Sequence, residues 1–263
     1  MLSRQQADLG VRPSPIFFAI VALTAAAAFL TTVGDDNRVA VFVFVVGAWT
    51  VSLIFHEFAH AFLAWKGGDR SVVQRGYLTL DPRTYTHPIL SFALPLVFII
   101  MGGIGLPGGA VLLNRGVLSD VRASVVAVAG PLTNLTLGCL SLGLLGADVI
   151  DSTTQPGLAG AVGFFGFLQI AVFVLNMLPI PGFDGYAIIE PALPINTRQL
   201  LRPVATYGPL IAILAIWRFE PLGDAFWTAV TSITEAFGIE RLEWTCGYWQ
   251  FRFWESELPA ACR

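Results

Sequence analysis

An apolar run at residues 39–65 carries two histidines and a glutamate within a segment long enough to cross a membrane. As an α-helix, this run would be roughly 40 Å long. It contains His56, Glu57 and His60 in the pattern H-E-x-x-H. Ionisable side chains are costly inside a bilayer and are usually functional there. The segment therefore predicts a membrane-spanning helix that is also part of a functional site.

The spacing of the two histidines favours a metal site. Side chains four residues apart lie on the same face of a helix, so His56 and His60 can reach one ion. Imidazole ligands with a neighbouring carboxylate fit Zn²⁺ and predict one ion per chain. Glu57 is then placed to take a proton from a water molecule at the metal. The chain has only three histidines, two of them here, which weakens the alternative of ordinary buried core residues.

The rest of the chain is also strongly apolar. Hydrophobic residues make up 55% of the sequence and charged residues 13%, whereas soluble proteins are about 25% charged. Further apolar runs of membrane-helix character lie at residues 16–33, 123–147, 158–178 and 204–217. These runs predict an all-α polytopic membrane protein with a helical transmembrane core.

Charge and cysteine content indicate no other class of function. The net charge of −3 and the lack of a basic stripe argue against nucleic acid as a partner. Cys139, Cys246 and Cys262 are far apart and form no C-x-x-C pair, so the sequence indicates no cysteine site. Residues 224–239 are amphipathic, and the aromatic tail at 244–254 suits a bilayer interface.

Charged residues around the first two apolar runs predict an orientation. Arg4 and Arg12 precede the first run and acidic residues 35–36 follow it, while Lys66 and further arginines follow the second run. Because cytoplasmic loops are rich in arginine and lysine, we expect the N-terminus in the cytoplasm and the active site toward it. The acidic loop at 148–156 is expected outside.

A zinc site built for hydrolysis needs a third protein ligand beside the histidines. The candidate is Asp184, in the stretch N-M-L-P-I-P-G-F-D-G at residues 176–185. The prolines end the preceding helix, and Gly185 permits a tight backbone path beside a ligand. The alternative reading is an ordinary turn, because Asp-Gly is common in turns.

Three motifs in this order resemble the site-2 protease family of intramembrane zinc metalloproteases. They are H-E-x-x-H at 56–60, G-P-x-x-N at 130–134 and N-x-x-P-x-P-x-x-D-G at 176–185. The resemblance covers roughly residues 49–190. Outside that range, the chain matches only as hydrophobic segments.

The resemblance implies a role for each residue of the site. His56, His60 and Asp184 correspond to zinc ligands, and Glu57 corresponds to the general base. Asn176 is implied as a second catalytic residue, which polarises the substrate carbonyl or holds the oxyanion.

The chain is most similar to a compact bacterial branch of this family, which implies an integral protein of the plasma membrane. No insertion of PDZ type is present. The stretch from Asp81 to Pro88 departs from the branch, with Tyr85 and His87 where a histidine and an acid are common. We therefore assign no function to His87.

If His56 and Asp184 share an ion, an even number of membrane crossings must separate them, yet three apolar runs lie between them. The run at 88–101 would be about 21 Å long as a helix, which is short for a core of about 30 Å. We therefore predict that residues 88–109 form a re-entrant segment.

Short alternating segments on both sides of the re-entrant segment predict a small β-sheet near the active site. They lie at residues 77–80 and 110–113. An exposed edge of this sheet could hold an unwound substrate. We expect an N-terminal transmembrane helix at 1–38, a catalytic membrane core at 39–193, and C-terminal helices with the aromatic tail at 194–263.

The predicted function is an intramembrane zinc endopeptidase that hydrolyses peptide bonds in or near transmembrane segments. Its partners would be membrane-anchored protein substrates and the lipid bilayer. One alternative is a catalytically idle membrane scaffold of the same family, and a second is a metal transporter. The sequence does not indicate an oligomeric state.

Overall fold

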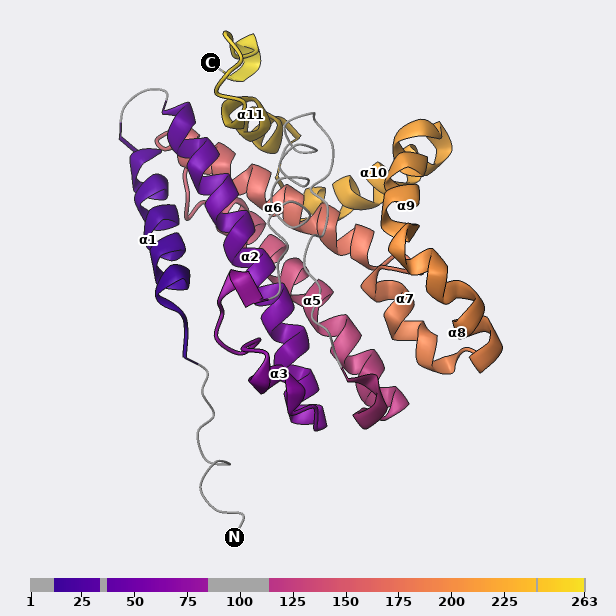
Figure 1. Cartoon of the computed structure of the whole chain (residues 1–263). Helices are drawn as coiled ribbons and strands as arrows, with labels where there is room; N and C mark the ends of the chain where they lie inside the picture. Colours follow the sequence, from indigo (N-terminus) through magenta and orange to yellow (C-terminus); the bar gives the residue numbers. More distant parts are fainter. Residues whose placement is uncertain (1–11, 34–36, 85–113, 240, 263) are drawn as a thin grey trace.

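The computed structural model describes residues 12–33, 37–84, 114–239 and 241–262, and over these it consists of helices and their connections (Figure 1). Within the described residues, three helices are long and apolar enough to cross a membrane, namely α2 (Arg38–Gly67), α5 (Asp120–Gly146) and α6 (Pro156–Asn176). A fourth is counted if a bent helix pair near the C-terminus forms one span. The predicted all-α membrane core is confirmed.

Helix α1 (Pro15–Leu30) packs along α2 and ends before the apolar run at 16–33 does. It ends early because the hydroxyls of Thr31 and Thr32 donate to the carbonyls of Ala28 and Phe29. These bonds satisfy carbonyls that the end of a helix leaves free. The helix of 16 residues is about 24 Å long.

The core of the protein lies along α6. This helix packs against α2, α5, α10 (Glu220–Glu235) and α11 (Arg241–Phe251), and most of its residues are buried. A helix that is apolar on all sides is stable when other helices surround it. Phe164, Leu168 and Leu175 of α6 are among the side chains that fill this core.

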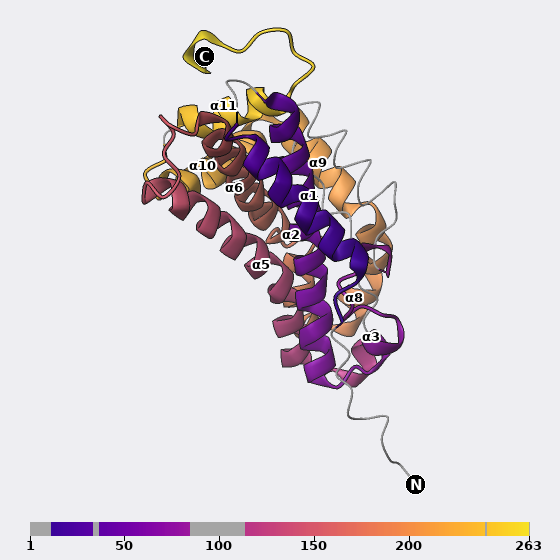
Figure 2. The ribbon, with the colours of Figure 1, turned by 90° about the vertical axis from the view of Figure 1, so that its left-hand side faces the viewer.

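Helices α2 and α5 meet at the C-terminal end of α2, where the guanidinium of Arg122 donates to the carbonyl of Gly67 at 3.1 Å. The short helix α3 (Ser71–Gln74) lies at this end of the molecule, whereas α11 lies at the opposite end (Figures 1 and 2).

A series of short helices follows α6. In chain order they are α7 (Asp184–Ile189), η4 (Glu190–Ala192), α8 (Ile195–Leu201), η5 (Arg202–Thr206) and α9 (Gly208–Arg218). The remaining short elements are η1 (Pro82–Thr84), η3 (Arg115–Val117) and η6 (Ala260–Cys262). The sequence predicted a span at 204–217. The structure has a bend of 68° between the segment Ile195–Thr206, which comprises α8 and η5, and α9, and Pro209 lies in the first turn of α9.

The predicted β-sheet is wrong, since no strand occurs among the described residues. The segment at 77–80 forms turns, in which Tyr77 N–H donates to Val72 and Thr79 N–H donates to Gly76. Tyr77 and its neighbour Leu78 are both buried, whereas neighbouring side chains of a strand point to opposite faces. Local hydrogen bonds and burial on both sides therefore override the alternating pattern. The predicted strand at 110–113, the re-entrant segment at 88–109 and His87 lie outside the described residues.

The C-terminal tail is tied to the start of α2. The guanidinium of Arg38 donates to the carbonyls of Trp249, Arg252 and Glu255 at 2.8 to 3.1 Å. The guanidinium thus binds three carbonyls near the C-terminal end of α11. A positive charge is stabilising at this end of a helix.

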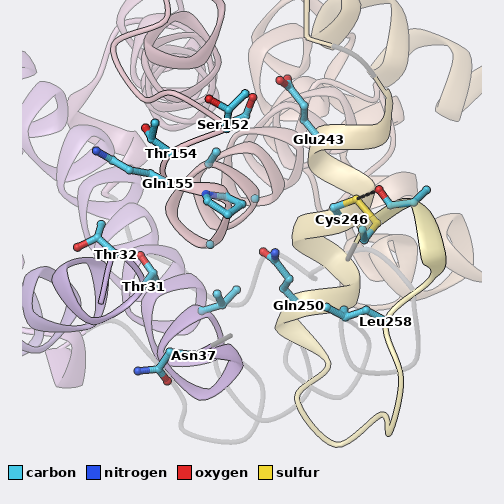
Figure 3. Close-up of a pocket in the computed structure, with 18 residues that line it drawn as sticks. Thr31, Thr32, Asn37, Ser152, Thr154, Gln155, Glu243, Cys246, Gln250 and Leu258 are labelled. Carbon is cyan, nitrogen blue, oxygen red and sulfur yellow. Dashed lines mark hydrogen bonds between the residues drawn. A yellow bond between two sulfur atoms is a disulfide. The ribbon is translucent and has the colours of Figure 1, made fainter. Parts of the chain in front are cut away.

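A disulfide joins Cys246 of α11 to Cys262 of the tail, with their Cα atoms 5.2 Å apart. This pair corrects the sequence reading, which indicated no cysteine site. The disulfide borders a pocket of about 760 Å³ (Figure 3). Ser152, Thr154 and Gln155 from the loop between α5 and α6 line the same pocket. The tail and this loop therefore lie at the same end of the protein.

Candidate metal centre

The first two members of the candidate site stand one turn apart on α2. His56 and His60 are both buried, and their Nε2 atoms are 3.1 Å apart. Each ring turns its Nε2 atom toward the same point, as their spacing of four residues predicts.

Asp184 reaches this point from the first turn of α7. Its carboxylate oxygens lie 3.3 Å from His56 Nε2 and 3.4 Å from His60 Nε2. A methyl group at Gly185 would overlap the carbonyl of Met177, so a glycine is needed where the chain folds back after α6. The hydroxyl of Ser124 in α5 donates to the carbonyl of Ile188 and holds α7 against α5.

The three donor atoms have the spacing of a zinc site. One donor atom from each residue lies within 4.8 Å of the other two. The two Nε2 atoms are 3.1 Å apart, Oδ2 of Asp184 lies 3.3 Å from His56 Nε2, and Oδ1 lies 3.4 Å from His60 Nε2. Ligand atoms about 2.0 to 2.1 Å from a tetrahedral ion are about 3.3 Å apart. Two imidazoles and one carboxylate are also a donor set found in hydrolytic zinc enzymes. The residues present therefore fit a zinc ion with one position open.

Gly130 is the residue of α5 that packs against the two histidines. A methyl group added at Gly130 would overlap Nε2 of both His56 and His60. The glycine of the G-P-x-x-N element thus leaves room for the two rings and for an ion between them.

The outer nitrogen of each imidazole also has a partner on α5. His60 Nδ1 lies 2.7 Å from the carbonyl oxygen of Val126, and His56 Nδ1 lies 2.6 Å from Oδ1 of Asn134. A carbonyl oxygen only accepts, so His60 carries its hydrogen on Nδ1 and directs the lone pair of Nε2 into the site. Such outer contacts are typical of histidines that bind metals.

The structure places the two predicted catalytic residues in buried positions. Glu57 follows His56 on α2, and Asn176 is the last residue of α6. Each is 3% exposed. Nδ2 of Asn176 has no hydrogen-bond partner within the described part of the chain. An unpaired buried amide is costly, which makes this group available to a ligand.

Comparison with known proteins finds relatives over most of the chain. The "Putative zinc metalloprotease Rip2" of Mycolicibacterium smegmatis is 45% identical over 224 residues, which are 80% of this chain and 85% of the relative. The protein of the same name from Mycobacterium tuberculosis is 41% identical over 251 residues, 93% of this chain and 95% of the relative. The chain belongs to the site-2 protease family of intramembrane zinc metalloproteases.

A more distant relative agrees with this family. The "Putative zinc metalloprotease YwhC" of Bacillus subtilis is 30% identical over 182 residues, 66% of this chain and 79% of the relative. No family model and no solved structure matches the chain. The relatives and the apolar helices together identify an integral membrane metalloprotease.

Sequence reasoning missed two polar residues beside the site. Gln169 of α6 bonds to Asn134, and Ser52 of α2 bonds to Gln169. A signal for both was present in the sequence. Gln169 is an amide within an apolar run, seven residues before Asn176 and so on the same face of its helix. Ser52 precedes His56 by four residues and shares its face in the same way.

Proposed function

We propose that the protein is an intramembrane zinc endopeptidase that cleaves membrane-anchored proteins in or near their transmembrane segments. The observation that carries this proposal is the cluster of His56, His60 and Asp184 inside a helix of membrane length. His56 is about 27 Å along α2 from its first residue and about 16 Å from its last, which supports a site below the membrane surface.

In this proposal, His56 Nε2, His60 Nε2 and one carboxylate oxygen of Asp184 hold one zinc ion. Bound zinc supplies a Lewis acid that polarises a peptide carbonyl and lowers the pKa of water. His56 and His60 are buried, which strengthens their electrostatic interactions.

Glu57 is proposed as the general base. Its carboxylate takes a proton from the attacking water and gives it to the nitrogen of the leaving amine. The buried amide of Asn176 is proposed to donate a hydrogen bond from Nδ2 to the carbonyl oxygen of the substrate. Its lack of a protein partner in the described structure supports that role.

The disulfide supports the orientation predicted from charge. Disulfides persist in oxidising compartments, and Cys246 lies at the same end as the acidic loop at 148–156. The histidines are nearer the other end of α2. We therefore propose that the active site faces the cytoplasm of a bacterial plasma membrane, while the disulfide and the pocket face outward.

A hydrogen bond ties Asn114 to the C-terminal end of α2. Asp69, two residues past α2, accepts a bond from the backbone N–H of Asn114 at 2.7 Å. Asn114 thus lies at the end of α2, close to where α5 begins. Burial tends to raise the pKa of Asp69, but hydrogen bonds from Ser71 and Asn114 lower it below its ordinary value, as expected for a bonded carboxylate.

A Glu57→Gln variant tests the proposed activity. The change preserves the size of the side chain but removes its basic group, so zinc content should stay that of the parent while cleavage of a membrane-anchored test protein is lost. The reconstituted protein and the variant would be compared by metal analysis and by gel assay of the substrate. Equal cleavage by the variant would refute the role of Glu57.

The parent protein and Glu57→Gln also distinguish the protease from an idle scaffold and from a metal transporter. A catalytically idle scaffold would show no cleavage with Glu57 intact. A metal transporter would move zinc across proteoliposomes, whereas the protease is expected to show no such flux. Buried polar residues of three described spans are joined by hydrogen bonds at one site, namely His56 and Ser52 of α2, Asn134 of α5 and Gln169 of α6, which supports the protease.

A further inference from the structure

We propose that Gln169 is a positioning residue, which acts through Asn134 to hold His56 in the tautomer that directs Nε2 toward His60 and Asp184. The inference rests on the proposed function, because it concerns how that metal site is held.

Four hydrogen bonds connect His56 to the backbone of its own helix. His56 Nδ1 lies 2.6 Å from Oδ1 of Asn134, and Nδ2 of Asn134 donates to Oε1 of Gln169 at 2.8 Å. Nε2 of Gln169 donates to the hydroxyl oxygen of Ser52 at 3.0 Å. The hydroxyl of Ser52 donates to the carbonyl of Trp49 at 2.8 Å.

The donor and acceptor of each of these four hydrogen bonds are determined by the last one, which ends at the carbonyl of Trp49. The carbonyl of Trp49 can only accept, so Ser52 must donate to it and accept from the amide nitrogen of Gln169. The amide oxygen of Gln169 then faces the amide nitrogen of Asn134. The amide oxygen of Asn134 consequently faces His56, whose Nδ1 must carry the hydrogen. The lone pair of His56 Nε2 is thereby left for the metal site.

The two histidines differ in how their tautomers are set. His60 bonds directly to the carbonyl of Val126, which has no donor end. His56 faces a side-chain amide, and a half-turn of that amide would exchange its acceptor for a donor. Gln169 removes this freedom, because its own oxygen requires the nitrogen of Asn134. His56 therefore depends on Gln169, whereas His60 does not.

The residues of this hydrogen-bond network are buried, so each depends on its protein partners. Gln169 is 0% exposed and lies in the middle of α6, where its neighbours in the sequence are apolar. Ser52 and Asn134 are also buried. No bulk water is available at this depth to replace a lost partner, so each polar group needs the others.

Gln169→Met is the test. Methionine retains the length of the side chain but has no amide, so Asn134 becomes free to turn its nitrogen toward His56. We expect zinc affinity to fall about 10- to 100-fold, the range found when outer partners of metal-binding histidines are removed. The affinity would be measured by competition with a chromophoric chelator in detergent.

Two further variants distinguish positioning from a general structural role. Gln169→Glu keeps an acceptor for Asn134 and should recover most of the affinity. The double variant Asn134→Leu/Gln169→Met should bind zinc no more weakly than Asn134→Leu alone, because Gln169 acts through Asn134. Thr234→Val is the matched control, since it removes a fully buried hydroxyl of α10 and should leave zinc affinity unchanged.

Unchanged zinc affinity in folded Gln169→Met overturns the inference. A double variant that binds zinc more weakly than Asn134→Leu alone also overturns it, as does a Gln169→Glu protein that binds zinc as weakly as Gln169→Met. If Gln169→Met does not fold, Ser52→Ala decides, with a smaller loss in the same direction expected and no loss overturning the inference. His56→Ala separates the two proposals. If it binds zinc like the parent, the proposed function fails; if it loses zinc while Gln169→Met does not, only the role of Gln169 fails.

Discussion

Replacing Gly130 by alanine should disable the metal centre while leaving the fold intact. The added Cβ would lie closer than 3.0 Å to atoms of both His56 and His60, whereas unbonded carbon and nitrogen atoms stay about 3.5 Å apart. The rings must therefore retreat by roughly 1 Å. Metal–ligand distances tolerate about 0.2 Å, and a misplacement of about 1 Å can cost about 100-fold in rate. We expect a loss of that size in cleavage, together with weaker zinc binding.

The stability of the variant should change little. Alanine gains about 1 kcal/mol over glycine in a helix interior, and overpacking costs about 1 to 3 kcal/mol. The net loss is then at most about 2 kcal/mol, the difference between the larger cost and the gain. Gly143→Ala is the matched control, because it lies in the same helix and no atom is within 4 Å of its added Cβ.

The assay compares both variants with the parent in detergent and in proteoliposomes. Zinc content, affinity from chelator competition, thermal midpoint and cleavage of a membrane-anchored test protein would be measured for each. Gly143→Ala should match the parent in zinc binding and cleavage. A Gly130→Ala protein with parental zinc affinity and cleavage would refute the placement of α5 over the histidines.

Three further predictions follow from the structure. Asp184→Ala should bind zinc more weakly in metal analysis, and full retention of zinc would remove Asp184 from the ligand set. Replacing Cys246 and Cys262 together by serine should lower the free energy of unfolding by about 3 kcal/mol, because the disulfide closes a loop with a sequence separation of 16; denaturant unfolding equal to that of the parent contradicts this expectation. A single cysteine introduced in the loop at 148–156 of a cysteine-free variant should react with an impermeant reagent outside intact cells, and reaction only after permeabilisation would reverse the proposed orientation.

Much of the candidate site could be predicted because its first half is local. His56 and His60 share a helix face through their spacing alone. Asp184 is more than a hundred residues away, and only the resemblance to a family joined it to the histidines. In the structure, ligand atoms of the three groups lie within 4.8 Å of one another.

The predictions that failed depended on contacts between distant segments. The pattern at 77–80 alternates as a strand does, yet its backbone bonds to the preceding turn, and the carbonyl of Thr79 accepts from Ser14 just before α1. Cys246 and Cys262 have no characteristic spacing, and the fold of the tail brings them together.

The sequence by itself determined the membrane class, the long apolar helices and the pair of histidines on one helix face. Hydrophobicity and helical periodicity are properties of neighbouring residues, so they can be read along the chain. Only the tertiary structure decided that Gly130 makes room for the imidazoles and that Gln169 sets the direction of the bonds behind His56. These roles arise where α2, α5 and α6 meet, and no local pattern specifies which side chains of separate helices will face one another.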